Sequence, residues 1–109
     1  MGEETKQAIT LEEVIKNINN MDQIAISDPI INELICSMDY KARFVGEYIQ
    51  LKIRYNNLHK MLVKHEAGTL GFEPTCDISI LEDQAYHMGN YLKALEIRSE
   101  VEKIELPKI

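Results

Sequence analysis

Four polar side chains in the C-terminal half of the chain have the types and spacing to bind a planar or anionic ligand. Gln84, His87, Tyr91 and Arg98 follow one another at spacings of 3, 4 and 7 residues, which places them on one face of a helix. A guanidinium can donate paired hydrogen bonds to a phosphate or carboxylate, and a tyrosine ring can stack on a planar group. The same residues could instead border an apolar seam and pair with a neighbouring helix. Both interpretations stay open.

A basic central segment supplies a second set of candidate ligand contacts. Residues 40–65 carry six lysine and arginine side chains against one acid, a net charge of +5, whereas residues 1–39 carry −6 and residues 66–109 carry −5. Within the basic segment, Arg43 and Arg54 are the candidates for contacts with phosphate groups. Alternatively, these bases only neutralise the acidic flanks, through surface pairs worth about 0–1 kcal/mol each.

The residue patterns typical of enzymes do not occur in the sequence. It contains no glycine-rich phosphate loop, no HExxH pair, no nucleophile elbow and no zinc-type spacing. The histidines at 59, 65 and 87 are too dispersed to indicate a metal site. We therefore expect a binding protein rather than an enzyme, with no catalytic residues, no metal and no cofactor.

Two matched apolar seams predict the helices that position these residues. The first seam has spacings of 4, 3, 4, 3 and 4 residues, and the second has spacings of 4, 3, 4 and 3. The first consists of Phe44, Tyr48, Leu51, Tyr55, Leu58 and Leu62, and the second of Leu81, Ala85, Met88, Leu92 and Leu95. Two seams of one period joined by a short connection predict a long antiparallel helical hairpin, about 40–66 and 79–104. Tyr48 and Tyr55 are expected mainly in its core.

Residues that end and start helices set the bounds of the predicted hairpin. Gly68 can adopt the left-handed conformation that ends the first long helix. Ser79–Glu82 has the pattern of a capping box that starts the second, with Asp77 as a competing cap. The apolar Leu70 and Phe72 between them indicate a packed turn.

The first 38 residues are predicted to add one or two short helices. Thr10–Glu13 and Asp28–Pro29 are helix-start signals, each followed by apolar residues at helical spacing. Gly46, inside the first long helix, permits close approach of a neighbouring helix. A chain of 109 residues fits one all-α domain, with short helices in 1–38 and the hairpin in 39–109. Its core is modest, so we expect self-association into a homo-oligomer.

The composition is that of a soluble globular protein. Apolar residues make up 45% and charged residues 28%, which argues against disorder. No apolar run approaches the length of about 18 residues that a membrane span needs. Cys36 and Cys76 lie outside any CxxC pair, so we expect free thiols in a cytosolic protein. The acidic segments on both sides of the basic segment argue against binding of duplex DNA.

Six side chains in residues 81–98 follow the pattern Leu-x-x-Gln-x-x-x-Met-x-x-Tyr-x-x-x-Leu-x-x-Arg. They are Leu81, Gln84, Met88, Tyr91, Leu95 and Arg98. With the preceding stretch FVGEYIQLKIRYNNLHKMLVK, residues 44–104 resemble a family of small helical-hairpin proteins of phages and prophages. Most members have no assigned activity. Comparable hairpins occur in phage proteins that sequester the nucleotide signals of CBASS and Thoeris immunity, a similarity at the level of fold.

This resemblance implies a non-enzymatic counter-defence protein in the cytoplasm of the host cell. Such a protein would sequester a cyclic nucleotide immune signal between the subunits of an oligomer. A second hypothesis is a protein-directed inhibitor of a host defence nuclease, of the anti-CRISPR type, whose acidic ends occupy a basic channel. A third is an oligomeric phage scaffold or accessory protein without a small ligand.

Overall fold

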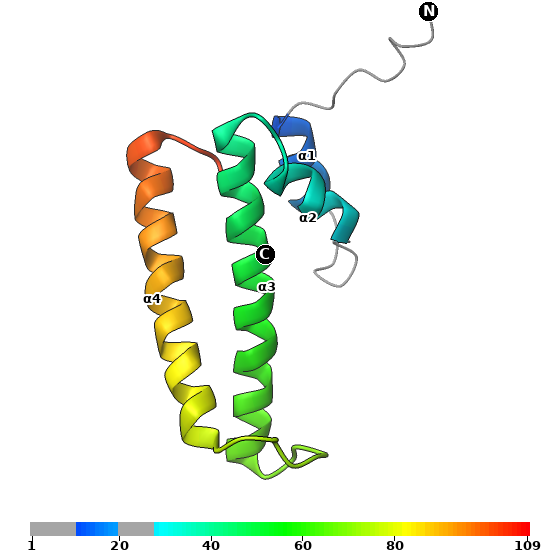
Figure 1. Ribbon diagram of the computed structural model, residues 1–109, viewed down its shortest axis with the longest axis vertical. Helices are drawn as coiled ribbons and strands as arrows, with labels where there is room; N and C mark the ends of the chain where they lie inside the picture. The colour runs from blue at the N-terminus through cyan, green and yellow to red at the C-terminus, as the bar shows by residue number, and fades with distance from the viewer. Residues whose placement is uncertain (1–10, 20–27) are drawn as a thin grey trace, which may run out of the picture.

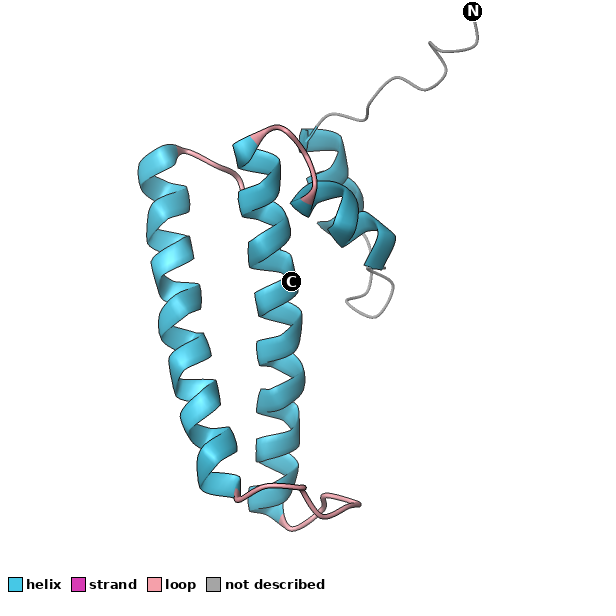
Figure 2. Ribbon diagram, viewed as in Figure 1, coloured by secondary structure: helices cyan, strands magenta, loops and turns pink. Residues whose placement is uncertain are grey.

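The computed structural model describes residues 11–19 and 28–109, and these residues form four helices. They are α1 (Leu11–Asn19), α2 (Asp28–Ile35), α3 (Tyr40–Ala67) and α4 (Ile78–Glu102). Figure 1 shows three layers, with α4 on one side, α3 in the middle, and α1 with α2 on the other side. The predicted all-α class is confirmed, since no strand occurs in the described part of the chain (Figure 2). None of these helices is long and apolar enough to span a membrane.

The two ends of α3 are fixed by the residues that flank it. Asp39 precedes the helix in an extended conformation, and its carboxylate accepts a hydrogen bond from the Lys41 amide at 3.0 Å. Gly68 follows it with a φ of 78°, and its amide donates to the His65 carbonyl at 3.1 Å. The predicted glycine end of this helix is therefore confirmed.

The bounds of α4 differ from the prediction at both ends. Asp77, not Ser79, caps the helix, because the Asp77 carboxylate accepts a hydrogen bond from the Ser79 amide at 3.1 Å. Ser79 thus lies inside the helix. The helix ends at Glu102 rather than 104, because Lys103 takes a left-handed conformation with a φ of 56°. This bend turns the C-terminal tail back toward α3, where Ile104 is buried.

The α3–α4 pair is tightly packed at only one end. The two helices lie side by side and run in opposite directions, joined by residues 68–77 (Figure 1). Phe44 and Tyr48 of α3 and Leu92 and Leu95 of α4 are at most 5% exposed. Toward the connecting loop the remaining seam residues are only half-buried, namely Leu51, Tyr55, Leu58, Leu62, Leu81, Ala85 and Met88. The seams are therefore incompletely covered at the loop end.

The opposite face of α3 packs against α2 at Gly46. A Cβ atom at this position would lie 2.9 Å from both Leu34 Cβ and Ile35 Cγ1, so only glycine allows this approach. Val45 and Ile49 beside it are fully buried, each stabilising the fold by about 1.5–3 kcal/mol. The close approach predicted for Gly46 is confirmed.

The structure describes only one of the two helix-start signals predicted in the N-terminal segment completely. The helix α2 begins at the predicted Asp28–Pro29 signal. The capping residue predicted for the first helix, Thr10, lies outside the described residues.

Candidate functional site

A cleft opens between α3, α4 and the loop that connects them. This loop lies at the end of the molecule away from α1 and α2 (Figure 1). Its volume of about 530 Å³ falls within the range of ligand sites. We call it the loop-end cleft. It is lined by Arg54, Asn57, Leu58, Met61, Phe72, Glu73, Pro74, Thr75, Cys76, Leu81, Gln84 and Met88.

The loop-end cleft combines an apolar floor with a few polar groups. The floor consists of the half-buried Leu58, Met61, Leu81 and Met88. At the rim lie Arg54, Asn57 and Gln84, all exposed, and the ring of Phe72 is 59% exposed. An aromatic ring can stack on a base, a guanidinium can bind a phosphate, and side-chain amides can bind base edges. The arrangement is suited to a nucleotide-sized ligand.

Two of the six predicted ligand contacts meet in this cleft, because Arg54 of α3 and Gln84 of α4 both line it. The other four lie elsewhere. Arg98 follows Gln84 by 14 residues, which is about 21 Å along a helix. The stripe predicted on α4 is therefore too long for one small ligand to contact from end to end.

Arg98 is already engaged within the protein. Its guanidinium lies 4.7 Å from the centre of the Phe44 ring, and its Nε donates to the Glu102 carboxylate at 2.8 Å. This hydrogen bond is the main cause that raises the pKa of Arg98 above its ordinary value. The geometry matches the alternative in which this residue borders the apolar seam.

The remaining predicted contacts also have local neighbours. Arg43 donates to the Ser37 carbonyl at 2.8 Å, which ties the start of α3 to the turn before it. His87 lies 3.7 Å from the Asp83 carboxylate and packs edge-on against Tyr86, with 5.4 Å between ring centres. Tyr91 is 45% exposed on α4 and does not line the loop-end cleft.

Tyr48 and Tyr55 of α3 belong to the packing between α3 and α4. Tyr48 is buried, and this burial, together with the nearby Glu96 carboxylate, raises the pKa of its phenol above 10.0. Tyr55 stacks on His59 with 6.1 Å between ring centres, and its ring also faces Gly89. The expectation that Tyr48 belongs to the core is confirmed.

Phe72 was not among the predicted ligand contacts, and the expectation that it packs into the turn is wrong. The loop that follows Gly68 leads across to α4 and leaves the Phe72 ring largely exposed beside the cleft, while Leu70 is half-buried. Asn57 and Cys76 also line the cleft without a sequence signal that distinguishes them. For Phe72, the sequence feature that could have indicated a ligand contact was an aromatic residue in a loop that contains glycine and proline.

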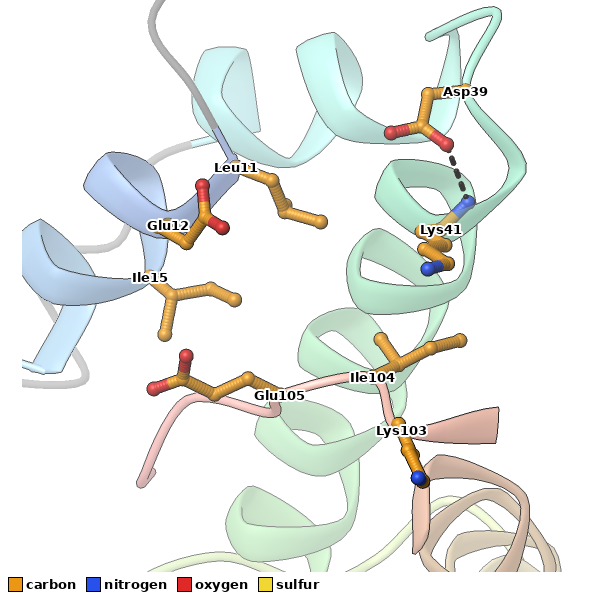
Figure 3. Close-up of a pocket in the computed structure, with 8 residues that line it drawn as sticks. All are labelled: Leu11, Glu12, Ile15, Asp39, Lys41, Lys103, Ile104 and Glu105. Atoms are coloured by element: carbon orange, nitrogen blue, oxygen red, sulfur yellow. Dashed lines mark hydrogen bonds between the residues drawn. The ribbon is translucent and has the colours of Figure 1, made fainter. Parts of the chain in front are cut away.

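A second cleft, of about 410 Å³, lies between α1, the start of α3 and the C-terminal tail (Figure 3). Figure 3 shows the carboxylates of Glu12 and Glu105 beside Ile15, across from Lys41. The lining contains three acids and two lysines, namely Glu12, Asp39, Glu105, Lys41 and Lys103. Carboxylates at this density disfavour a phosphate-bearing ligand.

His59 and His65 line a third hollow together with Glu66 and Glu82. Among the described residues, however, no group of three or more metal-ligating side chains is placed to hold a metal ion.

Comparison with known proteins identifies a family for residues 38–101. The model of the Sequestin family matches residues 38–101, which contain α3, the connecting loop and nearly all of α4. All residues that line the loop-end cleft fall within this segment, whereas most of those in Figure 3 fall outside it. No curated protein and no solved structure matches the chain. Because the family match covers more than half of the 109 residues, the chain belongs to the Sequestin family.

Proposed function

We propose that this protein sequesters a cyclic nucleotide signal by binding it in the loop-end cleft without converting it. The observation that carries the proposal is that Arg54 of α3 and Gln84 of α4 line one cleft with the exposed ring of Phe72. This cleft lies within the segment that matches the Sequestin family, and the family name indicates a sequestering binding protein. The resemblance to phage nucleotide sponges agrees with that name.

The chemistry of the cleft supports a nucleotide over other small ligands. Stacking of a base on Phe72 would contribute about 1–3 kcal/mol, and a charge-assisted hydrogen bond from Arg54 to a phosphate about 1.5–3 kcal/mol. The amides of Asn57 and Gln84 offer both donors and acceptors to base edges. The apolar floor excludes water beneath the ring of the ligand, which strengthens these polar contacts.

Binding without turnover is the second part of the proposal. Arg54 and Gln84 are hydrogen-bonding groups that do not transfer protons near neutral pH. The lining also contains the Glu73 carboxylate and the Cys76 thiol, but no histidine lines the cleft to exchange protons with them. On this proposal the ligand is held rather than hydrolysed. In the cytoplasm of an infected cell, a protein of this kind would lower the free concentration of an immune signal in proportion to its own abundance.

Calorimetric titration of the purified protein with cyclic dinucleotides and cyclic ADP-ribose isomers tests the proposal. We expect heat of binding with at least one of them, and we expect the nucleotide to be recovered chemically unchanged after the complex is denatured. Absence of heat with every compound at tens of micromolar would refute nucleotide sequestration. Recovery of an altered nucleotide would instead identify an enzyme. Capture of a nuclease from host lysate, together with silent titrations, would favour the protein-directed inhibitor.

A further inference from the structure

Two side chains of opposite charge line the loop-end cleft without pairing with each other. Arg54 comes from α3 and Glu73 from the connecting loop. Both are exposed, and neither forms an ion pair with any residue that the structure describes. Both charged groups are therefore available to a ligand.

The two charges lie toward different ends of the cleft. The loop that carries Phe72 and Glu73 follows the C-terminal end of α3 (Figure 1). Arg54 precedes Met61, another residue of the lining, by seven positions, so it lies about 10 Å farther from that end along the helix axis. A nucleotide has a matching layout, with its phosphates at one end and the polar edge of its base at the other.

The carboxylate of Glu73 is unfavourable in a phosphate-binding cleft unless the ligand brings hydrogen-bond donors to it. Its negative charge repels phosphates, and an ionised carboxylate only accepts hydrogen bonds. Phe72 precedes Glu73 directly in the chain and lines the same cleft. When a base stacks on the Phe72 ring, the donors on the edge of the base decide whether Glu73 attracts it or repels it.

Guanine is the one common base with two adjacent donors on its Watson–Crick edge. Its N1–H and its N2 amino group can both donate to one carboxylate, in a paired and charge-assisted arrangement. Adenine and cytosine each place an amino group beside a ring nitrogen that only accepts, so this lone pair would face the carboxylate. Uracil has a single N–H between two carbonyl oxygens. An unpaired carboxylate at the base end of the cleft therefore favours guanine over the other three bases.

We propose that Glu73 makes the loop-end cleft selective for guanine, so that the sequestered signal is a cyclic dinucleotide that contains this base. In this arrangement Arg54 holds a phosphate, Phe72 stacks on the base, and Glu73 accepts hydrogen bonds from the N1–H and N2 amino groups. Cyclic ADP-ribose isomers, whose base is adenine, are then the poorer ligands. This inference rests on the proposed function, because it assigns the ligand of the same cleft.

Calorimetric titration of the full-length protein with three matched cyclic dinucleotides tests the assignment. Cyclic di-GMP offers both donors, cyclic di-IMP lacks only the N2 amino group, and cyclic di-AMP has an acceptor in place of the N1–H. We expect cyclic di-GMP to bind about tenfold to a hundredfold more tightly than either of the others, the effect of one charge-assisted hydrogen bond.

A matched pair of variants tests whether the preference comes from Glu73. Glu73→Gln keeps the size of the side chain but removes its charge and replaces one acceptor with a donor. It should weaken binding of cyclic di-GMP by about tenfold or more and should not weaken binding of cyclic di-AMP. Glu66→Gln removes the same charge near the end of α3, outside the cleft, and should keep the preference of the wild type. Both variants should melt like the wild type, because both glutamates are exposed.

The possible results distinguish this inference from the proposed function. If none of the three dinucleotides and no cyclic ADP-ribose isomer binds, nucleotide sequestration is refuted, and the guanine assignment with it. If nucleotides bind without a preference for cyclic di-GMP, or if the preference persists in Glu73→Gln, the guanine assignment is overturned and sequestration still stands.

Discussion

Replacing Gly46 with alanine should destabilise the protein, whereas the same replacement at Gly89 should stabilise it. Both glycines lie inside long helices, so each substitution gains about 1 kcal/mol of helix propensity. At Gly46 the new Cβ would lie 2.9 Å from Leu34 Cβ and Ile35 Cγ1 and 3.0 Å from the Ile35 backbone nitrogen. At Gly89 the nearest atom, in the Tyr55 ring, would be 3.6 Å away, an ordinary van der Waals distance.

The expected loss of stability on Gly46→Ala depends on which of the neighbouring atoms can move. A backbone nitrogen and a Cβ atom cannot rotate out of the way, so α2 must shift away from α3 when Gly46 becomes alanine. Such overpacking costs about 1–3 kcal/mol. Set against the propensity gain, Gly46→Ala should lower the free energy of unfolding by up to about 2 kcal/mol. The difference between the two variants should be about 1–3 kcal/mol, because the propensity gain is common to both.

Denaturation followed by far-ultraviolet circular dichroism measures this difference. For a domain of this size, each kcal/mol corresponds to a shift in melting temperature of roughly 4–8 °C. Gly46→Ala should melt below the wild type and Gly89→Ala above it. Equal stabilisation by both substitutions would show that α2 does not press on α3 at Gly46, and the packing described above would be wrong.

Three further predictions concern stability. Leu95→Ala should lower the free energy of unfolding by about 2–5 kcal/mol, because Leu95 is 2% exposed. Leu58→Ala should lower it less, because Leu58 is half-buried at the cleft. Denaturant titrations that reverse this order would contradict the burial pattern. Asp77→Ala should cost about 0.5–2 kcal/mol through loss of the cap, and Ser79→Ala much less; equal losses in thermal melts would disprove the cap assignment. The raised pKa of Tyr48 means that its phenol ionises at a lower pH in the unfolded chain than in the folded protein. The stability that comes from this difference is complete below about pH 10 and is lost as the pH rises through the folded pKa. In denaturation experiments across alkaline pH, Tyr48→Phe should lose less stability with rising pH than the wild type does.

The helices were predictable because their signals are local. The seams of residues 44–62 and 81–95 repeat at helical spacing, and Gly68 has the one residue type that readily takes a positive φ. The bounds of α4 were less predictable. Asp77 and Ser79 were both candidate capping residues, only two positions apart. At the other end, the helix is terminated by a left-handed Lys103, a residue type that seldom adopts this conformation.

The candidate site was predictable only in part. The spacing of residues along a helix shows which side of the helix they occupy, but it does not show whether another element packs over them. The spacing correctly placed Gln84 on the flank of α4 that faces solvent, but it also placed Arg98 there, and Arg98 is engaged by Phe44 and Glu102. Which part of a stripe borders a cleft depends on how far the neighbouring helices extend. Phe72 lies in a loop, where no periodic pattern reports exposure.

The claim that the loop-end cleft binds a nucleotide is tested most directly by titrating two α3 variants side by side. Arg54→Gln and Lys60→Gln remove the same charge from exposed positions on the same helix, but only Arg54 lines the cleft. With the cyclic nucleotide that binds the wild type, Arg54→Gln should weaken affinity by about tenfold to a hundredfold, the loss of one charge-assisted hydrogen bond. Lys60→Gln should bind like the wild type. Equal affinities of the two variants would contradict binding in the loop-end cleft.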